Sequence, residues 1–356
     1  MPGRDGRELR VVAIGGGTGL STLLRGVKKY VVSAGDPDPS PGSDFARISE
    51  LCAVVTVTDD GGSSGRLRKE FNMLPPGDVR NCIVALSEDE TLLSKVFQHR
   101  FDKGTGLEGH SFGNLFLAAL TSLTGDFSEA VRLSSEVLAT RGHIYPATAA
   151  NIELEALMED GSRVRGETKI TATKGRVEEL FLVPPGPEPL PQTLDAIARA
   201  DLITVGPGSL FTSLIPNLLV CGIPEAIRDS AAVKVYICNL MTQANESLGR
   251  TAADHIRALY DHAGCRLFDH ALINQRQASA ELKAKYALEG ASQIVLDLEA
   301  IEALGVCPVL GDYLFEDGVA RHDTHQLAKD LLDLMSQAPS ESHSRTGERG
   351  HRSAGN

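Results

Sequence analysis

The strongest constraint on the fold is a set of glycine-rich loops, each of which follows a short β-like run and precedes a helical pattern. The first loop, at residues 15–19 (GGGTG), follows the hydrophobic run 9–14 and precedes leucines at helical spacing. Residues 206–209 (GPGS) repeat the arrangement after a predicted strand at 202–205. Strands that alternate with helices predict a parallel sheet, and ligands bind such sheets at the carboxyl ends of the strands. The sequence therefore predicts an α/β protein with a Rossmann-like, doubly wound, mostly parallel sheet and one ligand-binding crevice.

One segment interrupts this alternation. Hydrophobic residues alternate with others from residue 152 to 158, Asp160-Gly161 predicts a hairpin turn, and β-like runs follow at 167–173 and 176–183. We interpret this segment as a small β-rich insert. The expected organisation is a disordered N-terminus at 1–8, a Rossmann-like core at 9–150 and 190–335, the insert at 151–189 and a disordered polar tail at 336–356.

Within the core, the proline-rich stretch 33–43 predicts a loop, and the apolar stretch 112–123 predicts a buried helix. Further β-like runs are expected near 270–274, 293–297 and 306–310, and a last helix is expected at 324–335.

Composition and charge exclude several classes of protein. Hydrophobic residues make up 42% and charged residues 23% of the chain, as in ordinary soluble proteins, and no apolar run approaches the roughly 18 residues of a membrane span. The formal net charge of −12 argues against a nucleic-acid partner, which would need a basic face. The N-terminus has no apolar signal segment, and the six cysteines contain no C-x-x-C pair. We therefore expect a cytoplasmic protein with reduced thiols, mostly in the core, and neither a nucleic-acid nor a membrane partner.

The glycine loops are candidates for phosphate binding, because glycine lets a ligand approach the backbone and a helix N-terminus offers N–H donors. A dinucleotide fingerprint is imperfect here, since Leu20 stands where a third glycine belongs, and no Walker lysine follows. The alternative is a tight strand-to-helix turn without a ligand. The predicted nucleotide- and phosphate-binding residues are Gly15, Gly16, Gly17, Thr18, Gly19, Gly206, Gly208, Ser209 and Arg321.

A second motif begins with the adjacent carboxylates of Asp59 and Asp60 at a predicted strand end. Two neighbouring carboxylates repel each other, so we expect a cation such as Mg²⁺ or a hydrogen-bonded substrate there, although Asp59 could simply order the turn. The run from Gly61 to Gly65 matches the hydrolase pattern G-x-S-x-G, but nothing in the sequence marks a partner histidine. The predicted substrate- or metal-binding residues are Asp59, Asp60, Ser63, Ser64, Arg66, Asp78, Asn81, His110, Asn114, Asn239 and Thr242, of which Asp78 and His110 could instead be helix caps.

Arg321 precedes the last predicted helix and could clamp a diphosphate or pair with surface acids. Thr324, in the first turn of that helix, is a candidate phosphorylation site, because a helix N-terminus stabilises negative charge. The alternative is that Asp323 caps the helix and Thr324 is an ordinary solvated residue.

Six segments taken in order carry a resemblance to a known family: IGGGTGLSTLLRG, VVTVTDDGGSSGRLR, LPPGDVRNC, GHSFGNLFLAAL, ITVGPGSLFTSLIPNLLV and NLMTQ. They closely resemble the YvcK family of gluconeogenesis factors, within the CofD-like superfamily of phospholactate transferases. The resemblance spans about residues 9–335. It implies a Rossmann-like fold and a cytoplasmic protein that binds nucleotide-sugars such as UDP-N-acetylglucosamine. It also implies a role in cell shape and wall synthesis during growth on gluconeogenic carbon sources.

In the transferase branch of that superfamily, the acidic pair that matches Asp59 and Asp60 lies near a deazaflavin acceptor and a metal ion. The GGSSGRLR run after the pair departs from that branch and is typical of the YvcK side. The leading hypothesis is thus a regulatory protein that binds a UDP-sugar or related nucleotide diphosphate, with no catalytic residue assigned and a homo-oligomer as an open option. The alternatives are a CofD-like transferase that moves 2-phospholactate to a deazaflavin, in which Asp59 and Asp60 would hold Mg²⁺, and an NAD-dependent oxidoreductase.

Overall fold

The computed structural model describes residues 8–32, 47–87 and 92–337. Most of the two termini predicted to be disordered, and all of the loop predicted at 33–43, lies outside these residues. Glu8 belongs to the first strand, and Ser336 and Gln337 belong to the last helix.

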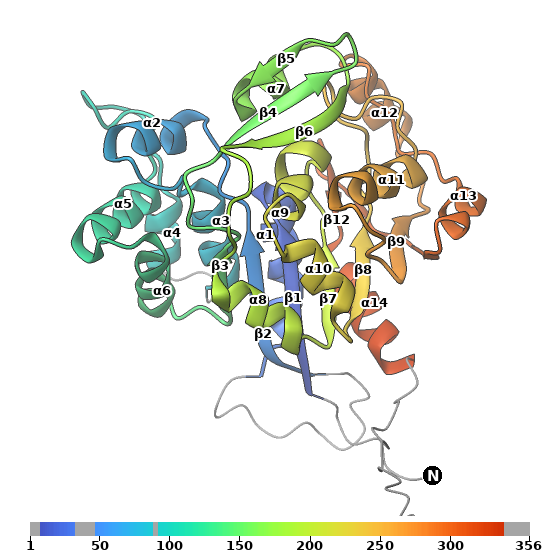
Figure 1. Ribbon diagram of the computed structural model, residues 1–356, viewed down its shortest axis with the longest axis horizontal. Coiled ribbons are helices and arrows are strands. Elements are labelled where there is room, and N and C mark those ends of the chain that lie inside the picture. Colours follow the sequence, from blue (N-terminus) through green and yellow to red (C-terminus); the bar gives the residue numbers. More distant parts are fainter. Residues whose placement is uncertain (1–7, 33–46, 88–91, 338–356) are drawn as a thin grey trace, which may run out of the picture.

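A seven-stranded parallel sheet forms the centre of the molecule, with the strand order β10-β9-β8-β7-β1-β2-β3 (Figure 1). The order runs outward from β1 in both directions, so the chain direction across the sheet reverses between β1 and β7. Such a switch point is where open α/β sheets bind ligands. The predicted α/β fold class is confirmed. The strands are β1 (Glu8–Gly15), β2 (Arg47–Val55), β3 (His143–Pro146), β7 (Leu202–Val205), β8 (Val233–Ile237), β9 (His270–Asn274) and β10 (Cys307–Gly311).

Helices cover both faces of the sheet because its central strands are hydrophobic on both sides. In β1, Val11 and Ala13 belong to one buried cluster, whereas Val12 and Ile14 belong to the other. The first cluster is closed by α1 (Gly17–Val27), η1 (Lys28–Tyr30), α2 (Gly62–Phe71), α3 (Gly77–Leu86), α4 (Leu92–Gln98), α5 (Phe112–Thr124), α6 (Phe127–Val137), α12 (Ala280–Ala287) and α14 (Thr324–Gln337). The second is closed by α8 (Pro191–Arg199), the π-helical turn η2 (Leu210–Leu214), α9 (Ile215–Leu218), α10 (Ile223–Asp229), α11 (Ala252–Ala263) and α13 (Leu298–Ala303).

A small antiparallel sheet with the order β5-β4-β6 sits beyond the carboxyl ends of the central strands, at the top of Figure 1. Its strands are β4 (Glu153–Met158), β5 (Arg163–Arg165) and β6 (Val177–Val183). The predicted hairpin turn is present: the Asp160 carboxylate accepts a hydrogen bond from the Ser162 N–H at 2.9 Å. A two-stranded ribbon, β11 (Leu314–Glu316) and β12 (Ala320–His322), precedes α14.

Two strand predictions were wrong. Residues 167–173 contain several β-branched side chains, yet Glu167–Ala172 forms the helix α7. Its first turn is stabilised from another part of the chain, because the Asp60 carboxylate accepts hydrogen bonds from the Thr168 N–H (2.8 Å) and hydroxyl (2.6 Å). Residues 293–297 form no regular strand; Gln293 makes only an isolated antiparallel bridge to Met241, in the loop after β8.

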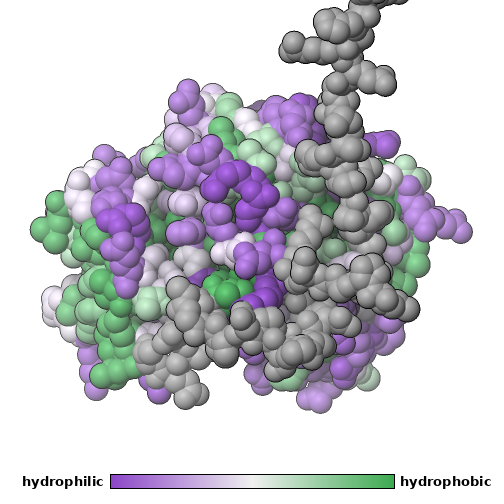
Figure 2. Space-filling model, turned by 90° about the horizontal axis from the view of Figure 1, so that it is seen from below, coloured by the Kyte–Doolittle hydropathy of each residue, from purple (hydrophilic) through white to green (hydrophobic). Residues whose placement is uncertain are grey.

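The helix α5 is buried on one face only, although its sequence is apolar nearly all round. Leu117 is fully buried, whereas the Leu123 side chain is 82% exposed. Figure 2 views the molecule from below, on the face opposite the small sheet, and hydrophobic residues lie along its left side. Figure 1 places α5 and α6 on that same left side. The six cysteines form no disulfide; Cys52, Cys82 and Cys238 are buried, whereas Cys221 and Cys307 are exposed.

One further finding concerns membrane spans. In the described part of the chain, no single helix is long and apolar enough to cross a membrane. The segments Leu210–Leu218 and Ile223–Asp229 are long and apolar enough only when they are taken together, and they meet at a bend of 76°.

Candidate functional site

A crevice of about 560 Å³ opens at the switch point between β1 and β7. The loops that follow β1, β7 and β8 line it, together with parts of α7, the end of α12 and the ribbon strand β12. The crevice therefore lies between the carboxyl ends of the central strands and the small β-rich insert. This is the position that the strand order predicts for a ligand.

The two glycine loops pack directly against each other at this crevice. A side-chain Cβ at Gly19 would lie 2.3 Å from the Pro207 carbonyl oxygen, and one at Gly208 would lie 3.6 Å from the Gly16 carbonyl oxygen. Gly17 has a φ of +61°, a left-handed conformation that favours glycine. The glycines therefore allow both the left-handed backbone conformation and the close contact between the loops. The N–H groups of Thr18 and Gly19, in the first turn of α1, have no hydrogen-bond partner among the described residues.

Several residues predicted from the sequence line the crevice together. These residues are Gly16, Gly17, Thr18, Gly19, Gly208, Ser209, Asn239 and Thr242, with Gly15 and Gly206 directly behind them at the strand ends. Asn239 accepts a hydrogen bond from the Gly208 N–H at 3.3 Å, and Gln243 donates one to the Ser209 hydroxyl at 2.7 Å. The loop after β8 therefore holds the second glycine loop in place.

Acidic side chains of the crevice were missed at the sequence level. Glu167 comes from α7 and Glu246 from the loop after β8, and no lysine or arginine is among the lining residues in the described part of the chain. Burial raises the pKa of Glu246 to about 7, and burial together with the charges of Asp59 and Asp78 raises the pKa of Glu167 to about 9. Neither glutamate stands in a recognisable motif, so only the tertiary structure places them here.

Glu246 is almost completely buried, with 2% of its surface exposed. One carboxylate oxygen accepts a hydrogen bond from the Thr212 hydroxyl at 3.3 Å, and the other has no partner among the described residues. A buried oxygen without a partner is costly, so a ligand that donates a hydrogen bond to it would gain affinity.

Asp78, in the first turn of α3, lies against the first glycine loop. Its carboxylate oxygen Oδ2 would be 2.9 Å from a Cβ at Gly16, and it accepts a hydrogen bond from the Gly17 backbone. Burial and the nearby Asp59 charge raise the pKa of Asp78 to about 7. Asp78 therefore ties α3 to the start of α1.

The adjacent carboxylates of Asp59 and Asp60 point to different neighbours. Asp59 Oδ1 accepts a hydrogen bond from the Gly61 N–H at 2.8 Å. Asp59 Oδ2 lies close to Gly77, 2.6 Å from the position that a Cβ would occupy there. Asp60 Oδ2 lies the same 2.6 Å from a Cβ at Gly166, beside the insert. Among the described residues there is no group of three acidic, histidine or cysteine side chains arranged for a metal ion. A cation held here would need oxygens from a ligand as well as one carboxylate.

A buried cluster joins the first turns of α2 and α5. The Ser63 hydroxyl lies 2.9 Å from His110 Nδ1, and Asn114 Nδ2 donates a hydrogen bond to the Ser63 oxygen at 3.1 Å. Burial and the nearby Arg66 charge lower the pKa of His110. The structure thus supplies the partner histidine that the sequence did not mark. However, Asn114 binds the serine and not the histidine, so the arrangement differs from a Ser-His-acid triad.

The remaining predicted residues lie outside the crevice. Ser63, Ser64, Arg66, Asn81, His110 and Asn114 gather around α2, α3 and α5, and none of them lines the crevice. Arg321 is exposed on β12, between Ala320 and His322, which do line it. The Asp323 carboxylate accepts hydrogen bonds from the N–H groups of His325 and Gln326, both at 3.0 Å, and so caps α14, which begins at Thr324.

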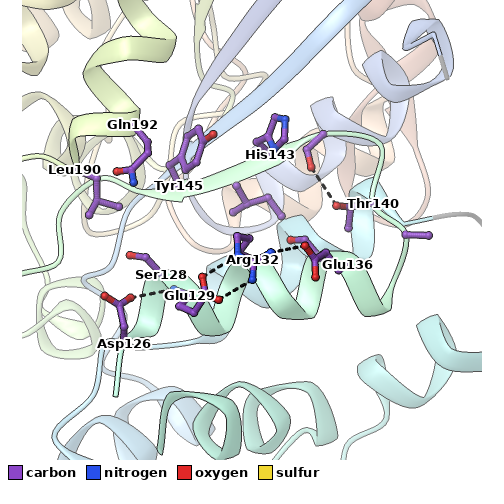
Figure 3. Close-up of a pocket in the computed structure, with 14 residues that line it drawn as sticks. Asp126, Ser128, Glu129, Arg132, Glu136, Thr140, His143, Tyr145, Leu190 and Gln192 are labelled. Carbon is purple, nitrogen blue, oxygen red and sulfur yellow. Dashed lines mark hydrogen bonds and ion pairs between the residues drawn. The ribbon is translucent and has the colours of Figure 1, made fainter. Parts of the chain in front are cut away.

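A larger hollow of about 610 Å³ lies at the edge of the sheet, between α6 and β3 (Figure 3). Arg132 forms ion pairs with Glu129 and Glu136 there, and Asp126 caps α6, so these charged groups already have partners. None of the glycine loops lines this hollow. The crevice at the switch point, although smaller, is therefore the better candidate for a ligand site.

Comparison with known proteins agrees with this architecture. Residues 11–314 match the family described as "2-phospho-L-lactate transferase CofD". The chain is 47% identical over 334 residues to the gluconeogenesis factor of Bacillus subtilis strain 168, covering 93% of this chain and 100% of that protein. It is 48% identical over 329 residues to the gluconeogenesis factor of Halalkalibacterium halodurans, covering 92% of this chain and 97% of that protein.

Solved structures give the same relationship. The crystal structure of a Bacillus halodurans protein superimposes with a TM-score of 0.85 at 47% identity, covering 92% of this chain and 100% of that one. A second structure, described as a member of the UPF0052 family, superimposes with a TM-score of 0.84. The sequence relationship and the shared fold therefore each cover more than nine-tenths of this chain.

Proposed function

The chain belongs to the CofD family and, within it, to the gluconeogenesis factors (the YvcK family), and on this basis we propose that it binds a UDP-sugar or related nucleotide diphosphate in the crevice between β1 and β7. One observation carries the proposal: two glycine loops at strand carboxyl ends pack together at the switch point and border a cavity of about 560 Å³. We place the diphosphate at the first turn of α1 and beside Gly208 and Ser209.

The rest of the crevice offers hydrogen-bonding groups for the nucleoside and the sugar. Asn239, Thr242 and Gln243 supply amide and hydroxyl groups, and Glu246 supplies the carboxylate oxygen that has no protein partner. A protonated carboxyl group, like an amide, keeps an acceptor oxygen for a sugar hydroxyl. The proposed role is regulatory, in the cytoplasm, supporting cell shape and wall synthesis during growth on gluconeogenic carbon sources.

Thermal unfolding with candidate ligands tests the binding proposal. A ligand present at a hundred times its dissociation constant adds about 2.7 kcal/mol to the free energy of unfolding. We expect UDP-N-acetylglucosamine to raise Tm more than GDP or NAD does. A shift with NAD alone, or with none of the three, would contradict the proposal.

A transferase that moves 2-phospholactate to a deazaflavin is the second candidate. The observation in its favour is Asp78, a carboxylate with a pKa of about 7 that contacts the first glycine loop and could accept a proton near neutral pH. Incubating the protein with a nucleoside-diphosphate-activated phospholactate, the deazaflavin alcohol and Mg²⁺ separates the two functions. Formation of the phosphodiester, lost on Asp78→Asn, would favour the transferase.

The acidic pair provides a prediction about Mg²⁺. Replacing both Asp59 and Asp60 with asparagine keeps the oxygens that Gly61 and Thr168 use as hydrogen-bond acceptors but removes both charges. If the pair helps to hold Mg²⁺ against the diphosphate, the double variant should fold and lose any Mg²⁺ dependence of ligand affinity. Isothermal titration calorimetry (ITC) with and without Mg²⁺ measures this. An unchanged Mg²⁺ response in the double variant, or none in the wild type, would count against the metal role.

Arg321 and Thr324 provide a second prediction at the rim of the crevice. We expect Arg321→Ala to weaken diphosphate binding at least tenfold, because a guanidinium–phosphate pair contributes roughly 1.5–3 kcal/mol. Thr324→Glu, which imitates part of the charge of a phosphate, should also weaken binding by competing for Arg321. Calorimetric titration of both variants, with Arg228→Ala as an exposed arginine control, decides the question. Equal affinities in all of them would remove this end of β12 from the site.

A further inference from the structure

Three arginines lie around the first turn of α5 and the loop that precedes it, outside the crevice. Arg66 donates a hydrogen bond to the Glu108 carbonyl at 2.7 Å, and Arg100 donates one to the Gly109 carbonyl at 2.5 Å. Arg80 approaches from α3, and its Cδ would lie 2.9 Å from a Cβ at Gly113. None of the three forms an ion pair with a carboxylate in the part of the chain that the structure describes.

This lack of ion pairs is notable because the protein as a whole is acidic. The formal net charge is −12, and other arginines of the described chain, such as Arg10, Arg163 and Arg257, form ion pairs with acidic side chains. Arg80 is partly buried, and its guanidinium donates to the neutral amide of Asn81 at 2.6 Å. A guanidinium that is partly removed from water without a counter-ion is unfavourable, and an anion that binds beside it removes that cost.

The same place brings together two helix N-termini. The helix α2 begins at Gly62 with no side chain capping its first turn, and α5 begins at Phe112. The hydrogen bond between Asn114 and Ser63, at 3.1 Å, joins these two first turns. In α5 the Phe112 N–H donates to the His99 carbonyl at 2.9 Å and the Asn114 N–H donates to the Ser111 hydroxyl at 3.3 Å, so the uncapped first turn of α2 is the main source of free N–H groups. Both N-termini carry partial positive charge and add to the field of the arginines.

His110 adds a directed donor. The Ser63 oxygen accepts a hydrogen bond from Asn114, and the Ser63 hydroxyl lies 2.9 Å from His110 Nδ1. In the tautomer in which the serine hydroxyl donates to Nδ1, the neutral imidazole carries its own proton on Nε2. Ser63 and Asn114 are positioning residues, and in that tautomer the Nε2 edge of the ring is a hydrogen-bond donor.

We propose that Arg66, Arg80, Arg100 and His110, with the first turns of α2 and α5, form a second anion site that binds a phosphate monoester, separate from the nucleotide crevice. A dianion with three free oxygens matches several donors that come from different directions, whereas a carboxylate would use fewer of them. None of these residues lines the crevice. The charges of Asp78 and Asp59 also act on Arg80, and Asp78 lies against the first glycine loop.

Calorimetric titration of the full chain with inorganic phosphate, at constant ionic strength in chloride, tests the site. We expect the wild type to bind phosphate, and Arg80→Gln and Arg100→Gln each to weaken this binding at least tenfold. Arg228→Gln, which removes an exposed guanidinium paired with Asp229, is the control and should bind phosphate like the wild type. Arg100 is exposed, so Arg100→Gln keeps the test valid if Arg80→Gln does not fold.

A crevice variant separates this site from the nucleotide site. Gly17→Val should leave phosphate binding intact while it impairs UDP-N-acetylglucosamine binding, because Gly17 belongs to the first glycine loop. Phosphate binding that is lost in Gly17→Val and unchanged in Arg80→Gln and Arg100→Gln would overturn the second site. An equal loss in Arg228→Gln would also overturn it, as a general effect of charge. If UDP-N-acetylglucosamine fails to bind the wild type while phosphate binding depends on Arg80, only the nucleotide-sugar proposal fails.

Discussion

Replacing Gly19 with alanine is expected to abolish nucleotide-diphosphate binding and to destabilise the fold by about 2–3 kcal/mol, the upper range for overpacking a tight contact. A Cβ at this position would lie 2.3 Å from the Pro207 carbonyl oxygen, 2.7 Å from its carbon and 2.8 Å from the Gly208 Cα. All three atoms belong to the backbone, so no side chain can rotate away. The two glycine loops must separate, and the N–H groups on either side of the crevice can then no longer reach one diphosphate. We expect the affinity to fall at least a hundredfold.

Denaturant unfolding and calorimetry with UDP-N-acetylglucosamine measure the two effects of Gly19→Ala. Gly264→Ala is the control, because Gly264 ends α11 outside the crevice and a Cβ there would meet nothing within 4 Å. Its φ of +68° should cost about 1 kcal/mol in alanine while the glycine loops and the affinity stay unchanged. Wild-type affinity in a folded Gly19→Ala protein would show that contact between the loops does not shape the site.

The sequence located the crevice because its signals are local. A β-like run followed by glycines and a helical pattern is visible within about twenty residues. Because parallel strands present their carboxyl ends at one edge of the sheet, the loops that follow them are predicted to meet there. The function of each glycine was not visible. Gly16 makes room for Asp78 and Gly19 for the second glycine loop, and both neighbours come from distant parts of the chain.

The errors and omissions share one physical cause, which is contact between segments far apart in sequence. Residues 167–172 have β-like composition, but the carboxylate of Asp60, more than a hundred residues earlier, stabilises their first helical turn. That helix brings Glu167 to the crevice. The pairing of Ser63 with His110 and the burial of Glu246 likewise depend on tertiary structure, and no spacing in the sequence marks them.

The buried charge of Glu246 leads to a strong pH-dependent prediction. Its pKa is raised from 4.5 to about 7, chiefly by burial, whereas the unfolded chain keeps the ordinary value. Between these two values the folded state binds more protons than the unfolded state, so the contribution of Glu246 to stability is full below about pH 4.5 and is lost as the pH rises to 7. Glu246→Gln removes this loss. We expect the variant to be about 3–3.5 kcal/mol more stable than the wild type at pH 8 and nearly equal to it at pH 4, since each pKa unit corresponds to about 1.4 kcal/mol.

The same substitution should strengthen ligand binding in the same pH range. No lysine or arginine lines the crevice in the part of the chain that the structure describes, so an ionised Glu246 repels a diphosphate, and a neutral glutamine does not. We expect wild-type affinity for UDP-N-acetylglucosamine to fall as the pH rises from 6 to 8 and that of Glu246→Gln to change much less. Urea unfolding and calorimetry at pH 4, 6 and 8 measure both effects, with the exposed Glu178→Gln as the control. The prediction is wrong if the stability and the affinity of Glu246→Gln depend on pH in the same way as those of Glu178→Gln. In that case the pKa of Glu246 is not raised by burial, and the diphosphate binds whether or not Glu246 is protonated.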